Sequence, residues 1–191
     1  MLDHMARWYA VDAADERVFT SAPYVFRYEK TFAAPPAAVW ESLVCDESLS
    51  AWSSTVTALT WSSPPRPFGV GTTREVVLAP GLARVHERFF RWDEGAPLLV
   101  HRLRGQPPPV FKTFAETTSS NRTGADGDST RFTWTVAIEP KRAFALAFKP
   151  LAPVLRLAFG RLATDGGSAT SPAPGDGNSP RRRRYAVPHG C

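Results

Sequence analysis

The sequence predicts an α+β fold in which a curved antiparallel sheet of seven strands wraps around a long C-terminal helix. Three observations predict it. Residues 141–165 carry large apolar side chains at steps of three and four, the pattern of one side of a helix. The middle of the chain is a series of short segments of alternating polarity, typical of half-buried strands. Short links separate these segments, and short links join antiparallel neighbours.

The length of 191 residues suits one domain with appendages. We expect an N-terminal lead-in of residues 1–23, a domain of residues 24–166 and a disordered tail of residues 167–191. The formal net charge is +5, of which the tail contributes +3 because it holds four arginines against Asp176. The domain's remaining charge is too small to indicate a nucleic-acid surface, so no nucleic-acid partner is expected.

The lead-in has no signal-peptide pattern, since its first ten residues contain Asp3 and lack an apolar core. Translation can begin at Met1 or Met5, and both starts stay open. Residues 11–20 are acidic and mixed in polarity, which predicts a segment packed loosely if at all.

Cys45 and Cys191 are the only cysteines, so no disulfide framework is predicted, in keeping with a reducing cytoplasm. The use of Arg over Lys, with much Ala and Pro, indicates a GC-rich bacterial source.

The first predicted strand covers residues 24–32, where Tyr24, Phe26 and Tyr28 alternate with other residues. A helix then opens at two prolines, where a missing amide donor costs nothing, and a second short helix ends at Trp52. The buried side of the first helix is predicted to be Val39, Trp40, Leu43 and Val44, and Asp46 is the predicted cap of the second.

Six further strands are predicted, with a loop over residues 62–71 between the first two. The strands are residues 55–61, 72–78, 84–92, 98–104, 110–118 and 131–139. The last one alternates most regularly. Its predicted inward residues are Phe132, Trp134, Val136 and Ile138, and its outward residues are Arg131, Thr133, Thr135 and Glu139.

The C-terminal helix carries the stripe Phe144, Phe148, Leu151, Leu155, Phe159 and Leu162. Pro150 and Pro153 each remove a backbone donor, which predicts a short helical turn, a break near Lys149 and a helix over residues 151–164. The prolines, Lys149 and Arg156 argue against a transmembrane segment.

The widths of these elements bear on function. Seven strands span about 29 Å, whereas one helix with its side chains covers only about 10–12 Å. A single helix therefore cannot seal that face of the sheet, and the remaining space is filled by bulky side chains or left as an apolar pocket.

Three local motifs lie within this order of elements: Ala-Pro-Pro-Ala-Ala-Val-Trp at 34–40, Gly-Val-Gly-Thr-Thr-Arg at 69–74 and Thr-Arg-Phe-Thr-Trp-Thr-Val at 130–136. With them, residues 24–165 resemble the START-like, or SRPBCC, superfamily, and within it the polyketide cyclase/dehydrase-like proteins. The resemblance implies a helix-grip fold and a cavity between sheet and C-terminal helix that receives lipids, polyketides or other hydrophobic small molecules. It offers no general catalytic motif.

Two titratable residues are candidates for acid–base chemistry in such a cavity. His101 shares a strand face with Leu99 and Leu103, so it is either a ligand-facing acid or base or a histidine satisfied by the backbone. Glu87 shares a face with Val85 and Phe89 and is either a general acid or one half of an ion pair. The candidate partners of Glu87 are Arg74, Arg91 and Arg102, and His86 is predicted to lie on a solvated outer face.

Tyr28, Trp52 and Trp134 are wide, rigid surfaces suited to a lipid-like or planar ligand, or else plain core residues. The predicted ligand-binding set is Tyr28, Trp52, Glu87, His101, Trp134, Phe148, Leu151 and Leu155. No metal or cofactor is expected, because the histidines and cysteines lack ligand spacing and no phosphate-binding glycine loop or nucleophilic serine turn is present.

Three functions stay open. The first is a binding module for a hydrophobic small molecule, and the second is a cyclase or dehydratase using Glu87 or His101. The third is an interaction protein whose Arg181–Arg184 run recruits an anionic partner, a run that also predicts weak contact with a membrane surface.

Overall fold

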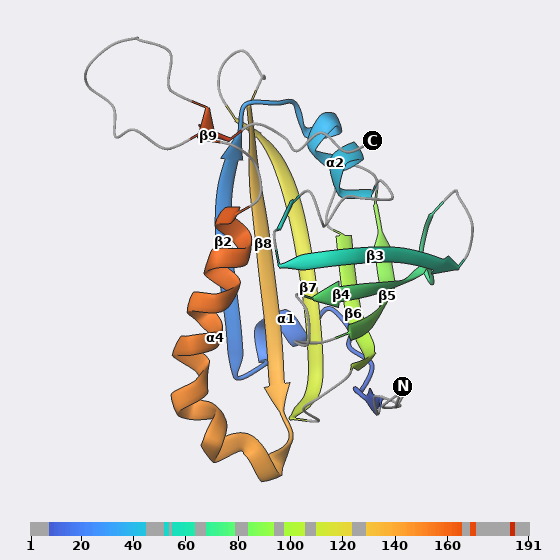
Figure 1. The fold of residues 1–191 in the computed structure, drawn as a ribbon, viewed down its shortest axis with the longest axis vertical. Coiled ribbons are helices and arrows are strands. Elements are labelled where there is room, and N and C mark those ends of the chain that lie inside the picture. The colour runs from blue at the N-terminus through green and yellow to red at the C-terminus, as the bar shows by residue number, and fades with distance from the viewer. Residues whose placement is uncertain are drawn as a thin grey trace, which may run out of the picture.

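The computed structural model describes residues 8–44, 52–53, 55–63, 68–78, 84–93, 98–105, 110–123, 129–165, 169–170 and 184–185. They form one sheet with helices packed on it, an α+β arrangement (Figure 1). Seven strands follow one another across the sheet in the order β3-β4-β5-β6-β7-β8-β2, each antiparallel to its neighbours. Their bounds are β2 Tyr24–Phe32, β3 Val56–Ser63, β4 Thr73–Leu78, β5 Arg84–Trp92, β6 Leu98–Gly105, β7 Phe111–Thr123 and β8 Ser129–Pro140.

Each predicted strand corresponds to one of these seven, and three strands of two residues add to them. β1 (Tyr9–Ala10) pairs with β6, and β10 (Arg184–Tyr185) lies parallel to β2 with β9 (Ala169–Thr170) on its other side. β9 and β10 belong to the tail that was predicted to be disordered, so that prediction is wrong for these four residues. An edge strand presents unpaired backbone donors and acceptors, and β10 pairs with those at the end of β2.

The two faces of the sheet are both buried in part. On one face, which we call the inner face, Phe114, Val136 and Ile138 are fully buried. On the other, Ala115 and Ala137 are fully buried against Val18 of α1 (Val18–Ser21). The lead-in is therefore packed on the sheet, and the prediction of loose packing is wrong. Of the β8 residues predicted to face outward, Arg131 is exposed, Thr135 and Glu139 are partly buried and Thr133 is buried.

Helix α2 (Pro36–Val44) begins at the second proline, as predicted, and buries Val39 and Leu43. These residues pack with Phe32, Trp52 and Phe132 at one end of the inner face. The predicted second short helix lies outside the described residues except for Trp52.

Helix α4 (Ala145–Asp165) follows a single 3-10 turn (Arg142–Phe144) and contains both prolines, so the predicted break near Lys149 is wrong. Each proline deprives the carbonyl four residues earlier of its donor. Those carbonyls belong to Leu146 and Lys149, which are exposed, so water can satisfy them.

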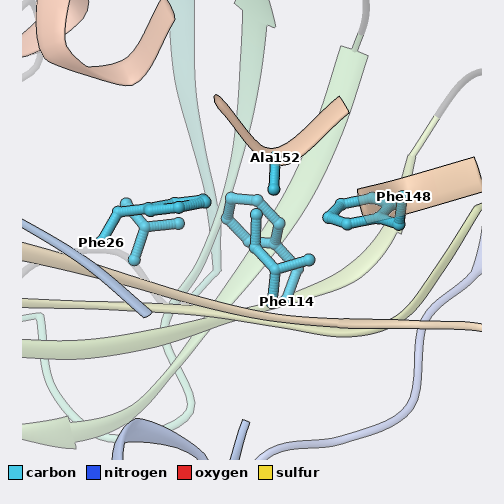
Figure 2. Close-up of a cluster of buried hydrophobic side chains, with 6 residues drawn as sticks. Phe26, Phe114, Phe148 and Ala152 are labelled. Carbon is cyan, nitrogen blue, oxygen red and sulfur yellow. The ribbon is translucent and has the colours of Figure 1, made fainter. Parts of the chain in front are cut away.

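The buried line of α4 also differs from the predicted stripe. Phe148 and Ala152 are buried, and Leu155 and Phe159 are partly buried against the same cluster, but Phe144 and Leu151 are exposed. Figure 2 shows Ala152 above Phe114, between Phe26 and Phe148. Because alanine is small, the helix approaches the sheet closely there and rotates the larger neighbours off the contact.

Candidate functional site

The candidate site lies where α4 runs alongside β2 and β8 at one side of the sheet (Figure 1). Tyr28 of β2 and Trp134 of β8 are direct cross-strand partners, with ring centroids 5.7 Å apart. Phe159 of α4 meets Trp134 edge-on at 5.9 Å. These three partly buried rings, which we call the aromatic wall, join the helix to the sheet.

Polar groups are attached to the aromatic wall. The Tyr28 hydroxyl donates a hydrogen bond of 2.7 Å to the backbone carbonyl of Arg156. Burial raises the pKa of Tyr28, and the positive charge of Arg156 partly opposes that rise. The Trp134 Nε1–H donates to Glu116 Oε2 at 3.3 Å. The inner face thus offers a carboxylate and a phenol beside the apolar cluster under α4.

A groove of about 490 Å³ opens beside Tyr28, lined also by Pro153, Arg156, Leu157, Gly160 and Arg161. It is open to solvent and mostly apolar. A Cβ at Gly160 would lie at contact distance, 3.4 Å, from Tyr28 Cε1, so a larger side chain at this position would meet the tyrosine ring. The groove therefore has a tyrosine on its sheet side and two arginines on its helix side.

Lys30 is a further polar residue of the inner face, two residues after Tyr28 on β2. It is buried, and its Nζ lies 5.4 Å from the centroid of the Phe32 ring. A cation at this depth is costly unless the surrounding groups compensate it.

Glu87 lies elsewhere on the sheet. Its Oε2 accepts a hydrogen bond of 2.8 Å from Arg74 Nε, and both side chains are about 95% buried. The Arg74 guanidinium also lies over the Phe89 and Trp61 rings, at 4.9 and 5.3 Å. This carboxylate is held in an ion pair within a second aromatic cluster, which consists of Trp61, Phe68, Phe89 and Trp92.

The candidate partners of Glu87 separate in the structure. Arg74 pairs with it, whereas Arg91 instead binds Asp93 and Glu16. The side chain of Arg102 lies outside the described residues.

The remaining predicted residues fall in different places. Trp52 is core, with its Nε1–H donated to Ser42 Oγ at 2.8 Å, and Phe148 is core beside Tyr24. Leu155 packs against the cluster under α4, whereas Leu151 is 39% exposed. The backbone of His101 pairs with Arg88 and Ala115, and its side chain lies outside the described residues.

His86 is not simply solvated. Its Nε2 lies 2.7 Å from Glu75 Oε2, and its ring packs on Trp8 at 4.8 Å. Within the part of the chain that the structure describes, no group of three His, Cys, Asp or Glu residues is placed to hold a metal ion.

The structure thus brings Tyr28, Trp134, Phe148 and Leu155 together in one cluster. Trp52 belongs to a neighbouring cluster that Trp134 also contacts, and Glu87 lies apart from both. Sequence analysis missed Lys30, Glu116 and Gly160. Glu116 shares a strand face with buried Phe114, and Lys30 lies between Tyr28 and Phe32 in the same alternation. That period-two signal was sufficient to find both charges.

Comparison with known proteins agrees with this architecture. Residues 24–166 match the model of a family described as polyketide cyclase / dehydrase and lipid transport. The chain belongs to this family. This membership gives the chain the START-like, SRPBCC-type fold, a fold that binds ligands.

Relatives of this family member include uncharacterized proteins of Mycobacterium tuberculosis and Mycobacterium bovis. Each is 33% identical over 134 residues, which cover 69% of this chain and 77% of the relative. Solved structures that resemble it share only the fold. A protein from Thermus thermophilus has a TM-score of 0.56 at 21% identity, covering 73% of this chain and 91% of its own. Norcoclaurine synthase from Thalictrum flavum, solved with dopamine and hydroxybenzaldehyde, has a TM-score of 0.53 at 18% identity, covering 80% and 92%.

Proposed function

We propose that this protein binds a hydrophobic small molecule, lipid-like or polyketide-like, between α4 and the inner face of the sheet. The observation that carries the proposal is the groove of about 490 Å³ beside Tyr28, at the edge of the contact between α4 and β2. Ligand pockets span about 300–1,000 Å³ and are mostly apolar with a few polar groups, so this groove has a fitting size and lining. The cytoplasm is the compartment we predict for this binding.

Tyr28 is the member of the aromatic wall that lines the groove, and a ligand that extends further beneath α4 would contact Trp134 and Phe159. Tyr28, Trp134 and Phe159 are rigid rings that bury large apolar areas at low cost in side-chain entropy. Arg156 and Arg161 line the groove, which favours an amphipathic ligand with an acidic group. We include in this proposal that the groove leads to an enclosed cavity between α4 and the sheet.

Native mass spectrometry of the purified protein, with dodecanoic acid added as the probe, tests this function. We expect a bound fatty acid in the parent protein and its loss in Trp134→Ala, Leu155→Ala and Gly160→Leu, the last of which fills the groove. Trp92→Ala is the matched control, since Trp92 is also partly buried but belongs to the second aromatic cluster. Equal binding by the parent, Trp134→Ala and Gly160→Leu would refute the proposal.

Enzymatic turnover is the second candidate function. One observation favours Glu116 as its acid–base residue in place of the predicted Glu87. Glu116 is the described carboxylate that contacts the aromatic wall, whereas Glu87 is held by Arg74. In a cyclase or dehydratase of this family, Glu116 and the Tyr28 hydroxyl would move protons at the ligand. Turnover of a polyketide-like substrate should then fall in Glu116→Gln while fatty-acid binding persists, and unchanged turnover in Glu116→Gln would exclude this role.

A further inference from the structure

The outward side of α4 is unusual for a helix at the surface of a sheet protein. Leu146, Val154 and Leu157 are 79%, 60% and 59% exposed, and the exposed Pro150 and Pro153 lie between them. Steps of four, three and four join Leu146, Pro150, Pro153 and Leu157, and Val154 lies four residues after Pro150. The five residues therefore form one band along the helix, which we call the outer ridge. It lies opposite Phe148 and Ala152, which pack on the sheet.

The whole segment Arg142–Ala163 is long and apolar enough to cross a membrane by length and composition, and 17% of its most apolar window is buried. One side of α4 packs on the sheet through Phe148. A transmembrane position of this helix would therefore disrupt the core described above. A helix with one packed side and one apolar outward side can instead lie in the plane of a membrane surface.

The charges next to the outer ridge all have one sign. Residues 140–164 contain Lys141, Arg142, Lys149, Arg156 and Arg161 and no acidic residue. Long cationic side chains beside an apolar line place their charges at the level of lipid head groups while their stems cover apolar surface. Two copies of this helix packed ridge to ridge would bring these cations together, which disfavours a second copy as the occupant.

From these observations we propose that the outer ridge of α4 docks on an anionic lipid bilayer. The occupant is the bilayer surface itself, with Leu146, Val154 and Leu157 inserted among the lipids and the flanking cations on their head groups. This docking surface differs from the Arg181–Arg184 run of the tail. The membrane-docking proposal goes beyond the proposed function, and the experiment that tests it measures membrane binding in the absence of a small-molecule ligand.

Vesicle co-sedimentation of the full chain tests the proposal. One set of vesicles contains phosphatidylglycerol with phosphatidylcholine, and the other contains phosphatidylcholine alone. We expect binding to the anionic vesicles only, and at least an approximately tenfold weaker binding in Leu146→Glu/Val154→Glu, because carboxylates are repelled from both the lipid interior and the anionic surface. Val70→Glu is the matched control, since Val70 is 69% exposed and lies away from α4.

Two further variants separate the helix from the tail and from self-association. The variant Arg181→Ser/Arg182→Ser/Arg183→Ser/Arg184→Ser should leave most vesicle binding intact, and complete loss of binding in this variant would assign the contact to the tail and overturn the proposal. Light scattering of the parent protein should give a monomer mass whether or not Leu146 is replaced. A dimer that dissociates in Leu146→Glu would make a second copy the occupant and equally overturn the proposal. Unchanged far-ultraviolet circular dichroism in each variant shows that the fold is retained.

Discussion

The two sides of the inner face bury their surface by different means. Under α4, the strands β2, β7 and β8 meet a helix, and the core there is apolar: Phe26, Phe114, Val136, Ile138, Phe148 and Ala152. On β3, β4 and β5 the space is filled by side chains of the sheet itself and by Trp40 of α2. That second cluster combines Trp61, Phe68, Phe89 and Trp92 with the buried Arg74–Glu87 pair.

The difference follows from the width of a helix. Because α4 covers only about 10–12 Å of a sheet several times wider, the uncovered strands must supply their own filling. Large rings do this efficiently, and Arg74 fits among them because a guanidinium stacks on aromatic faces while pairing with a carboxylate. The groove lies on the helix-covered side, beside Tyr28. We therefore place ligand binding on the first side.

The largest expected loss of stability comes from a substitution that disrupts the second cluster. Arg74→Met leaves Glu87 buried without its partner, which should lower the free energy of unfolding by about 3–5 kcal/mol. The matched control is Arg84→Met, since Arg84 also pairs across β4 and β5, with Glu75 at 3.3 Å, but is 53% exposed. An exposed pair contributes at most about 1 kcal/mol. Urea unfolding of both variants measures the difference.

The double variant Arg74→Met/Glu87→Leu sharpens that result. Replacing both charges by apolar side chains removes the unpaired carboxylate, so most of the lost stability should return. If Arg74→Met and Arg84→Met lose the same stability, the buried pair has no special role in closing this half of the sheet.

The next effect concerns the helix-covered side. Ala152→Leu forces extra methylene groups between α4 and Phe114, and we expect a loss of about 1–3 kcal/mol in unfolding free energy. Ala158→Leu on the exposed part of the same helix is the control and should change stability by less than about 0.5 kcal/mol. Equal losses would mean that Ala152 does not set the distance between helix and sheet.

These two sides were not equally predictable from sequence. Alternation located all seven long strands, and for β5 it gave both ends, because period-two patterning is a local property. The stripe on α4 was displaced, since a search for large side chains overlooks Ala152, the residue around which the contact is built. The prolines were expected to break α4. Whether a helix tolerates an internal proline depends on whether water can reach the carbonyl that loses its donor, and only the packed structure determines this.

The ion pair of Glu87 was one of its two predicted alternatives, with Arg74 among the candidate partners, and the structure confirms it. The aromatic cluster around that pair was the least predictable part. Its existence depends on register: Trp61 lies opposite Arg74, and Arg74 lies opposite Glu87. Register in turn depends on turns and on the bulges within β3 and β5, which no pattern in the sequence announced. For the site, alternation identified Tyr28 and Trp134, while the groove required knowing that Gly160 meets Tyr28.

A smaller effect tests the junction of α4 and β2. Tyr28→Phe removes the hydrogen bond to the Arg156 carbonyl and should cost about 0.5–1.5 kcal/mol at neutral pH. Burial raises the pKa of folded Tyr28 above its ordinary value of 10.0, so the folded protein keeps the phenolic proton where the unfolded chain loses it. The parent should therefore lose stability as the pH rises above 10, and Tyr28→Phe should lose less. Thermal unfolding from pH 8 to pH 11 gives the comparison, and parallel curves would contradict it.

The smallest expected effect has the opposite sign. Gly160→Ala adds a Cβ at ordinary contact distance from the Tyr28 ring and removes the entropic cost of glycine in a helix, which should stabilise the protein by about 0.5–1 kcal/mol. Gly71→Ala is the control, because Gly71 has a φ of +90° and an alanine there should destabilise. If Gly160→Ala stabilises the fold yet weakens dodecanoic acid binding, the glycine is retained for the groove at the expense of the helix. Stabilisation with unchanged binding would separate Gly160 from the ligand and move the site deeper under α4, towards Trp134.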